Sequence, residues 1–370
     1  MMRVVVFDEL QHDRPQSFRV FLAAFLRELD AAGIEYRVVS PAWSIPGVRS
    51  QRHHLVVSAL LRQIAYPIAA RRHLAGAHLN FLVSGGLVHL LWAAPRAART
   101  VVFCHDVLPL LPATALWHRL DFGAAFRQAY LRRAQTRAFE RATLIITPSQ
   151  STKADLLATT RVAADRVVVI PHAVDREVFF PGSKPDARRR LGWASDARIV
   201  LAIVTTERRK NVEGLLAAFA ILAREDPRAI LVLIGHLSAG QQRLAEATGA
   251  GTRIRRLSEL PAAELADCYR AADCLAHLSF YEGFGYPLLE ALACGCPVTC
   301  TATAAVREVV GNCALPVEPR DPAAVARALG RLLADAALQQ ALRAQGLERA
   351  LAFTGERGYA AAMRRAWAAS

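Results

Sequence analysis

Short runs of β-branched residues alternate along this chain with longer segments rich in alanine and leucine. That alternation is typical of parallel βαβ units, in which a helix connects each strand to the next. The sequence therefore predicts an α/β protein with two series of strands. The expected strands are 4–7, 38–39, 79–83, 101–104, 144–147 and 167–170, followed by 199–204, 230–235, 254–257, 274–277, 298–300 and 314–317.

The length of the chain points to two domains. At 370 residues it exceeds one ordinary sheet domain and is long enough for two, each with its own hydrophobic core. A polar segment at residues 181–186 separates the two series and has the composition of a linker. We therefore expect a first domain over residues 1–180 and a second over residues 181–352.

The seven cysteines lie mostly within apolar segments, and none belongs to a C-x-x-C pair. This pattern favours neither a zinc site nor a disulfide framework, and it fits a reducing cytoplasm. The apolar run at residues 4–7 is too short for a signal peptide, and no span approaches the ~20 apolar residues of a membrane-crossing helix. We expect a chain that is not threaded through a membrane.

The formal charge of +14 and the pI near 10.2 predict an acidic partner, which could be nucleic acid, an anionic membrane surface or a phosphorylated substrate. Between residues 52 and 74, apolar side chains recur at near-helical spacing beside arginines, as in an amphipathic helix that lies on a membrane. The alternative is that these arginines decorate ordinary solvated helices. Two regions are rich in arginine, one with Arg52, Arg62, Arg71 and Arg72 and the other with Arg119, Arg127, Arg132, Arg133, Arg137 and Arg141.

The stretch from residue 281 to residue 298, YEGFGYPLLEALACGCPV, places two carboxylates around a glycine loop. Gly283 and Gly285 allow close backbone approach, and the helix start that comes next offers N–H groups to a phosphate. Glu290, about one turn into that helix, is placed to accept hydrogen bonds from a ribose diol. Glu282 precedes the loop, nearer the sugar. Alternatively, the glycines and the proline only mark a strand-to-helix connection.

This block resembles the signature of the retaining glycosyltransferases of family 4, which have the GT-B fold, and Glu282 and Glu290 match the E-x7-E pair of that family. The resemblance implies two Rossmann-like, doubly wound domains that face one another across a cleft. The N-terminal domain would bind the acceptor and the C-terminal domain the nucleotide sugar. The resemblance also implies that the segment 353–370 forms a final helix that packs back on the N-terminal domain.

The segment 205–211, TTERRKN, follows the first strand of the second series and is similar to the E-x-R-K-N element of the family. In that element an arginine and a lysine hold the donor pyrophosphate, so the resemblance assigns this role to Arg209 and Lys210. Thr205 stands where some members carry an arginine, and we include it among the donor contacts. Without the resemblance, these cations would be a solvated charge run.

A polar pair, His105 and Asp106, ends an apolar run in the first domain. It resembles the H-D element of the family, whose histidine lies beside the donor sugar and the incoming hydroxyl. Histidine can donate, accept or shuttle protons near neutral pH, so we expect His105 to take part in catalysis. We expect Asp106 to orient the loop or His105. The alternative is a structural histidine at a strand end.

Three further elements resemble family landmarks, namely residues 147–153, residues 169–175 and Glu308. Either Ser149 or Ser151 is expected to cap the helix that begins beside it. Glu308 is a weaker candidate for support of the glycine loop.

The loop after the first strand, residues 8–17, contains no glycine, although relatives commonly have a glycine-rich loop there. Close backbone approach to a ligand is therefore less available. Side chains such as Gln11, Arg14 or Ser17 would have to supply the contacts.

Together these residues predict transfer of a hexose or deoxyhexose from a nucleotide sugar to a hydroxyl, with retention of anomeric configuration as the resemblance implies. Cations and loop amides would stabilise the leaving diphosphate, and front-face attack is preferred because no further carboxylate stands out as a nucleophile. No D-x-D triplet is present, so we expect no metal or other cofactor. The expected catalytic residues are His105, Glu282 and Asp106, and the donor-binding residues are Thr205, Arg209, Lys210, Gly283, Phe284, Gly285 and Glu290.

A GDP-linked, mannose-type donor is our first expectation, with a UDP-linked sugar as the alternative. The expected acceptor is a glycan on a lipid carrier at the inner face of a bacterial membrane, in polysaccharide or lipopolysaccharide synthesis. A sugar-nucleotide epimerase would need an acid/base carboxylate in the first domain, for which Asp106 is the obvious candidate. A non-catalytic, basic nucleic-acid-binding protein would explain the charge but would leave Glu282 and Glu290 without a role.

Overall fold

The computed structural model describes residues 2–9, 16–40, 61–111, 132–355 and 357–368. The chain forms two compact units, one of Met1–His172 with Glu356–Ser370 and the other of Ala173–Gly355. Each unit contains a six-stranded parallel sheet, as the alternating pattern predicts. All twelve expected strands are present, with ends that differ by at most a few residues, because each is a short β-branched run bounded by polar or turn residues.

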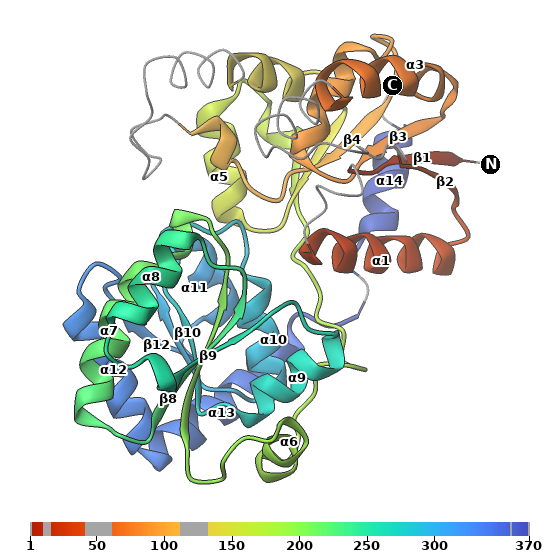
Figure 1. Ribbon diagram of the computed structural model, residues 1–370. Coiled ribbons are helices and arrows are strands. Elements are labelled where there is room, and N and C mark those ends of the chain that lie inside the picture. The colour runs from red at the N-terminus through yellow and green to blue at the C-terminus, as the bar shows by residue number, and fades with distance from the viewer. Residues whose placement is uncertain (1, 10–15, 41–60, 112–131, 356, 369–370) are drawn as a thin grey trace. The chain divides into compact units, whose positions relative to one another are not determined.

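The first unit has the strand order β2-β1-β3-β4-β5-β6, with helices in the connections (Figure 1). The order reverses at β1, which pairs with β2 on one side and with β3 on the other. Its elements are β1 (Arg3–Phe7), α1 (Gln16–Ala31), β2 (Glu35–Val39), η2 (Leu61–Ala65), α3 (Tyr66–Gly76), β3 (Leu79–Leu82), η3 (Gly85–Trp92), β4 (Thr100–Phe103), η4 (Leu108–Leu110), β5 (Leu144–Thr147), α5 (Gln150–Thr159), η5 (Ala164–Arg166), β6 (Val167–Val169) and α14 (Tyr359–Ala368).

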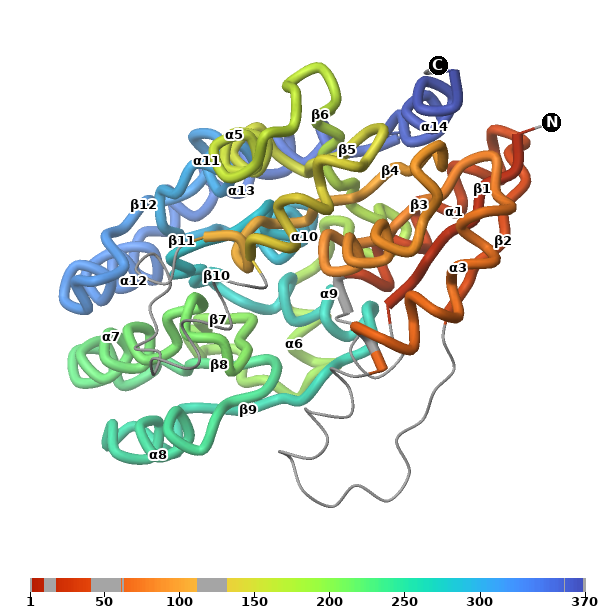
Figure 2. The backbone as a smooth tube through the Cα atoms, turned by 90° about the horizontal axis from the view of Figure 1, so that it is seen from above, coloured from red at the N-terminus to blue at the C-terminus, as the bar shows by residue number. Residues whose placement is uncertain are grey.

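The second unit has the strand order β12-β11-β10-β7-β8-β9, which can be followed in Figure 2. Here the order reverses between β7 and β10. Its elements are α6 (Lys184–Leu191), β7 (Arg198–Val204), η6 (Arg208–Lys210), α7 (Val212–Glu225), β8 (Ala229–Gly235), α8 (Ala239–Ala247), η7 (Gly251–Arg253), β9 (Ile254–Leu257), α9 (Ala262–Ala271), β10 (Cys274–His277), α10 (Tyr286–Cys294), β11 (Val298–Thr301), α11 (Ala304–Val310), β12 (Leu315–Val317), α12 (Pro322–Ala334) and α13 (Ala336–Leu351).

Helices cover both faces of the second sheet, so its strands are apolar on both sides. Along β7, Ile199 and Leu201 face a core that includes α9 and α10, whereas Val200 and Ala202 face a core that includes α7 and α12. Figure 1 shows α7, α8 and α12 on one side of this sheet and α9 and α10 on the other. The seven cysteines of the chain are buried as free thiols, in agreement with the predicted absence of a disulfide framework.

The polar segment 181–186 differs from the linker expected for it, because it leads directly into helix α6 inside the second unit. Ser183 caps that helix by accepting a hydrogen bond from the backbone N–H of Asp186, and Pro185 lies in its first turn. Serine, proline and aspartate favour helix starts as well as loops, so composition alone did not distinguish the two.

Helix α14 belongs to the first unit although it lies almost 190 residues beyond β6. It buries Tyr359 and Met363, and the Tyr359 ring packs edge-on against Phe21 and Phe25 of α1. The carboxylate of Glu28, on α1, accepts hydrogen bonds from the backbone N–H groups of residues 357, 358 and 360 at 3.0–3.1 Å. Glu28 thus caps the start of α14 from another helix.

Within the described residues, no helix is both long enough and apolar enough to cross a membrane. Residues 52–60 of the expected amphipathic helix lie outside the described residues. The remainder forms η2 and α3, in which Tyr66, Ala70 and Leu74 are buried. Ile64 and Ile68 are 55% and 71% exposed, so part of the apolar pattern faces solvent.

We predict that Glu28→Ala loosens helix α14 without unfolding the second unit. Loss of a cap that serves three amides and complements the helix dipole should destabilise α14 by about 1–2 kcal/mol. Amide hydrogen exchange should show faster exchange over residues 357–363. Glu225→Ala, which removes an exposed carboxylate at the end of α7, is the matched control and should leave α14 protection unchanged. Equal protection of α14 in wild type and Glu28→Ala would contradict this role.

Candidate functional site

The reversal of strand order in the second sheet brings together the segments that come after β7 and β10. In open parallel sheets, ligands bind outside the carboxyl ends of the strands at such a reversal. Residues 205–211 follow β7, and residues 278–285 follow β10. The backbone N–H of Phe280 donates to the carbonyl of Arg209 at 2.8 Å, which ties the two segments directly to each other.

A buried carboxylate, Glu282, holds the cations of the first segment. Its side chain is 8% exposed, and its Oε1 lies 2.6 Å from Lys210 Nζ while its Oε2 lies 3.1 Å from Arg209 Nη1. Arg209 also reaches the exposed Glu207, whose Oε2 lies 2.7 Å from Nη2. The structure therefore brings together Glu282, Arg209 and Lys210, which the sequence predicted to serve one donor, but in this state they pair with one another.

The electrostatics of this cluster keep Glu282 charged. Burial alone would raise the pKa of Glu282, but the nearby charges of Lys210 and Arg209 hold that pKa well below its usual range. His277, the last residue of β10, is 3% exposed, with its Nε2 at 3.1 Å from Glu282 Oε1. Burial lowers the pKa of His277 despite the nearby carboxylate, so this histidine is neutral at physiological pH.

The glycine loop after Glu282 leads into α10. Gly285 precedes the helix with φ at +108°, and a Cβ at this position would lie 2.8 Å from Leu288 Cδ1, so only glycine fits without a shift. No side chain caps the start of α10, and the helix dipole there favours an anion. The ring of Phe284 is buried against Phe353, with centroids 5.8 Å apart, so Phe284 anchors the loop in the core.

Glu290 lies one turn into α10, and its partner there is a residue that the sequence did not single out. Tyr269, on α9, is fully buried and donates a hydrogen bond from its hydroxyl to Glu290 Oε2 at 2.9 Å. Burial raises the pKa of Glu290 to about 7, although the bond from Tyr269 opposes that rise. The proposed ribose contact is therefore a carboxyl that titrates near neutral pH.

The first unit places His105 just beyond the carboxyl end of β4. Its Nε2 lies 2.9 Å from the carbonyl oxygen of Val83, which requires the proton on Nε2 and leaves Nδ1 as an acceptor. Burial lowers the pKa of His105 to about 3, so it is neutral throughout the physiological range. Its ring stacks on Phe18 at 4.3 Å and on His172 at 5.4 Å. A neutral acceptor is thus held rigidly at this edge of the sheet.

Asp106 performs a local structural task in this unit. Its Oδ1 accepts a hydrogen bond from the backbone N–H of Leu108 at 3.0 Å, which supports the turn of η4. Asp106 thus holds the loop after β4 in place, and its expected part in catalysis stays a prediction. Ser149 caps α5 by accepting a hydrogen bond from the backbone N–H of Thr152 at 3.0 Å. Of the two serines that the sequence offered for this cap, Ser149 and Ser151, Ser149 is therefore the one that forms it.

Two acidic residues follow β1, where the first sheet reverses its order. Asp8 and Glu9 are buried, and the hydroxyl of Ser84, just beyond β3, donates to Glu9. Tyr66 donates from its hydroxyl to the backbone carbonyl of Asp8 at 2.8 Å. Buried side chains therefore occupy the start of the loop after β1, for which the resemblance led us to expect glycine. The suggested contacts Gln11 and Arg14, and the side chain of Ser17, lie outside the described residues.

Thr205 and Glu308 have less direct connections with the cluster. The Thr205 hydroxyl accepts from the N–H of Glu207 at 3.3 Å and so shapes the turn after β7. Glu308 lies on α11, and its backbone carbonyl accepts from Arg349 Nη2 at 2.5 Å. This bond fixes the backbone of α11 and involves no carboxylate.

Sequence reasoning missed three residues that the structure places at these sites, namely His277, Tyr269 and His172. His277 ends an apolar strand in the same way as His105, so the rule that selected His105 could have selected it too. His172 follows β6 and stacks on His105. Burial, and then the neighbouring His105, keeps the pKa of His172 well below its usual value. Nothing in the sequence near Tyr269 indicates its bond with Glu290.

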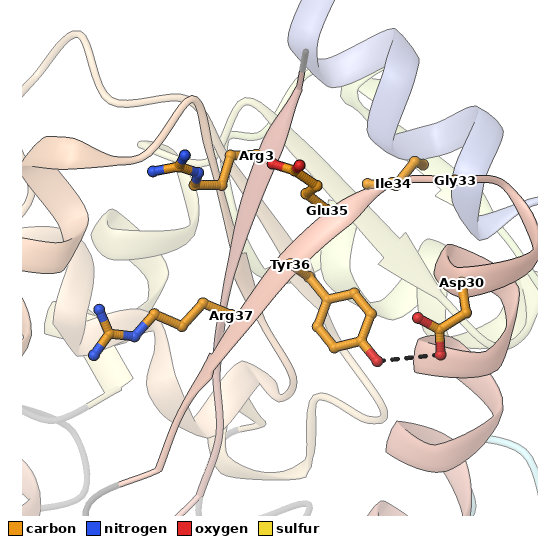
Figure 3. Close-up of a pocket in the computed structure, with 7 residues that line it drawn as sticks. All are labelled: Arg3, Asp30, Gly33, Ile34, Glu35, Tyr36 and Arg37. Atoms are coloured by element: carbon orange, nitrogen blue, oxygen red, sulfur yellow. Dashed lines mark hydrogen bonds between the residues drawn. The ribbon is translucent and has the colours of Figure 1, made fainter.

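A hollow of about 760 Å³ in the first unit lies near the amino ends of β1 and β2, at the opposite edge of this sheet from His105 and His172. Figure 3 shows Tyr36 turned toward Asp30, to which it donates a hydrogen bond at 3.2 Å, while Arg3 and Arg37 project to the other side. Parallel sheets bind ligands at their carboxyl edge, so this hollow does not share the site geometry. Across the part of the chain that the structure describes, no cluster of three or more His, Cys, Asp or Glu side chains could hold a metal.

Two family models match the chain, that of glycosyl transferases group 1 over residues 183–349 and that of glycosyltransferase family 4 over residues 19–178. O-antigen chain mannosyltransferase B of Escherichia coli is 31% identical over 270 residues, which cover 70% of this chain and 68% of that protein. D-inositol 3-phosphate glycosyltransferase 1 of Catenulispora acidiphila is 35% identical over 211 residues, 54% of this chain and 50% of that protein. The chain thus spans about half the length of this second relative.

Solved structures share the fold over the whole chain. Sucrose-phosphate synthase of Thermosynechococcus elongatus superposes with a TM-score of 0.81 at 22% identity, and both chains are covered completely. Alr3699/HepE of Anabaena, solved in complex with UDP and glucose, superposes with a TM-score of 0.75 at 18% identity, also over all of both chains. These likenesses confirm the predicted GT-B fold.

We predict that Glu290 makes the second unit less stable as pH rises through neutrality. Its pKa is raised to about 7 in the folded protein from 4.5, so the stabilisation is fully present below pH 4.5 and is lost as pH rises through 7. The free energy of unfolding should fall by at most about 3 kcal/mol by pH 8, which is the limit that the rise in pKa sets. Glu290 is only half-buried, so solvent screening makes the fall smaller than this limit. Urea unfolding of wild type and Glu290→Gln between pH 5 and pH 8 measures it. The two curves should diverge with rising pH, and parallel curves would show that Glu290 does not titrate as stated.

Proposed function

The chain belongs to glycosyltransferase family 4, and from that premise we propose that it moves a hexose or deoxyhexose from a nucleotide sugar to a hydroxyl of a glycan acceptor. The observation that carries this proposal is the cluster of Glu282, Arg209 and Lys210 beside the uncapped start of α10. It offers two cations and a helix dipole to a diphosphate and a fixed carboxylate to sugar hydroxyls. The basic nucleic-acid-binding alternative gives this buried cluster no task.

We propose a retaining reaction in which the bond between the anomeric carbon and the phosphate oxygen breaks while the acceptor oxygen bonds to the same face. The acceptor hydroxyl proton passes to the departing phosphate oxygen. Arg209 and Lys210 would stabilise the charge that accumulates on the diphosphate, which is electrostatic catalysis directed at the leaving group. To do so they must loosen their pairing with Glu282, so donor binding exchanges one anion for another.

The remaining residues would orient the substrates. Glu290 would hold the ribose diol, and the backbone of residues 283–285 would approach the phosphates at the glycine loop. His105 offers Nδ1 as a fixed acceptor for a hydroxyl, a role that its low pKa allows at any physiological pH. The two cations supply the charge neutralisation that a divalent ion provides in other transferases, so we propose that no metal is needed.

A GDP-linked, mannose-type sugar is the donor that we favour, since the relative from Escherichia coli is named an O-antigen chain mannosyltransferase. A UDP-linked sugar is the second candidate, because the structure of HepE contains UDP and glucose. On the same grounds, we place the reaction in the synthesis of a cell-surface polysaccharide or lipopolysaccharide, on the cytoplasmic side of the membrane.

The exposed side of α3 supports a peripheral contact with an anionic membrane. Ile64 and Ile68 are exposed, and Arg71 and Arg72 are exposed on the same helical segment. His73 lies near enough to Arg37 and Arg72 for their charges, after burial, to lower its pKa. Positive charge is therefore concentrated around exposed apolar side chains, the combination that favours anionic lipid surfaces.

We predict that one class of nucleotide sugar raises the melting temperature of the protein in the presence of EDTA. A panel of GDP-, UDP- and dTDP-sugars should show the shift for one nucleotide class. Glu290→Ala should lose most of it, because the ribose contact is gone, and Lys210→Ala should weaken binding of the nucleoside diphosphate itself. The exposed variant Glu225→Ala is the control. Binding that requires added Mg²⁺, or no binding at all, would reject the metal-free donor site.

We also predict binding to vesicles that contain phosphatidylglycerol and not to neutral phosphatidylcholine vesicles. Each basic residue near an anionic surface contributes about 1 kcal/mol, so Arg71→Ala with Arg72→Ala should weaken binding about 30-fold. The matched double variant Arg255→Ala with Arg256→Ala removes two exposed charges from β9 and should bind as wild type does. Cosedimentation measures all three proteins, and equal losses in both double variants would point to net charge instead of this helix.

A further inference from the structure

The imidazole of His277 lies against Glu282 without a well-formed hydrogen bond. His277 Nε2 is buried and 3.1 Å from Glu282 Oε1, yet the contact is not aligned, and Nε2 has no hydrogen-bond partner among the residues that the structure describes. The same oxygen, Oε1, accepts from Lys210 Nζ at 2.6 Å. In this state Lys210 is therefore the donor that sets the orientation of Oε1.

The proton of His277 must be on Nε2. His277 is neutral, and a bare Nε2 nitrogen would repel the carboxylate oxygen that lies 3.1 Å away, whereas an N–H there attracts it. A buried N–H without an acceptor is costly, so natural proteins rarely keep one without a reason. The group is thus a donor held close to an acceptor that is already engaged.

Binding of the proposed nucleotide-sugar donor would change which groups contact Glu282 Oε1. A diphosphate brings more negative charge than one carboxylate, so it competes with Glu282 for Lys210 and Arg209. When Lys210 turns to the phosphate, Glu282 loses its shortest contact while it remains buried. A buried carboxylate oxygen without a hydrogen-bond donor is unfavourable, so Oε1 needs another donor in place of Lys210.

We propose that His277 is a positioning residue that takes over Glu282 Oε1 when Lys210 turns to the donor diphosphate. Its Nε2–H then holds the Glu282 carboxylate in the orientation that receives the sugar hydroxyls. This inference rests on the proposed function, because it assumes a nucleotide sugar in the site. The strand end fixes the imidazole, so the carboxylate needs only a small rotation to align with it.

The inference separates two parts of donor affinity. The diphosphate part depends on Arg209 and Lys210, which His277 does not hold. The sugar part depends on the orientation of Glu282. Loss of the His277 N–H group should therefore weaken binding of the nucleotide sugar more than binding of the nucleoside diphosphate. Turnover should fall as well.

The experiment compares wild type, His277→Leu and His277→Gln by titration calorimetry with GDP, UDP and their sugar conjugates, together with kcat and KM. We expect His277→Leu to keep nucleoside diphosphate affinity within about threefold and to lose about tenfold or more in the sugar-dependent part of the affinity and in kcat, as for a lost bond to a charged group. His277→Gln, whose amide N–H can occupy the place of Nε2, should restore most of both.

The control is Thr299→Val, a nearly isosteric change on the neighbouring strand β11, where the Thr299 hydroxyl is buried and has no hydrogen-bond partner in the described part of the chain. It should leave both affinities unchanged. Equal nucleotide-sugar affinity and turnover in all variants would overturn the inference. An equal loss of diphosphate and sugar affinity in both His277 variants would overturn it too, because that result indicates that His277 contributes only packing. If wild type itself binds no nucleotide, the proposed function fails first and this inference with it.

Discussion

The ion pairs of Glu282 are the interaction on which the second unit's site depends. A carboxylate that is 8% exposed stays charged because Lys210 and Arg209 lie within 2.6 Å and 3.1 Å of its oxygens. These contacts join the loops after β7 and β10, which are more than 70 residues apart in sequence. Removal of such a carboxylate would leave two cations in a largely buried site, which typically costs about 3–5 kcal/mol. The same pairing pre-arranges the cations and makes an incoming anion compete for them.

Much of the fold could be predicted because parallel strands buried on both faces are continuous apolar runs. The strands β5, β9 and β10 match their predicted limits, and the GT-B fold follows from the order of the motifs. The segment 181–186 was harder to interpret, since Ser183 and Pro185 are favoured both in loops and at helix starts. Local sequence therefore indicated where the chain turns but did not distinguish a linker from the start of α6.

The candidate site was only partly predictable, for a different reason. Arg209, Lys210 and Glu282 were expected to serve one ligand, but their mutual pairing depends on burial, which composition does not reveal. Tyr269 was missed because its partner Glu290 lies on another helix. His105 was selected by its position at a strand end, whereas its tautomer depends on the carbonyl of Val83, on a neighbouring strand end. Protonation states are properties of the packed structure.

Helix α14 has a consequence for the order of folding. The first unit is encoded by residues up to 172 and completed by a helix that the ribosome makes only after all of the second unit. Until residues 357–368 emerge, the aromatic surface of Phe21 and Phe25 lacks Tyr359, and the carboxylate of Glu28 lacks the amides that it caps. Domains usually fold in the order in which they are made, with the N-terminal domain first, and the late synthesis of α14 prevents that order here. The first unit can therefore complete its packing only after the whole of the second unit has been made.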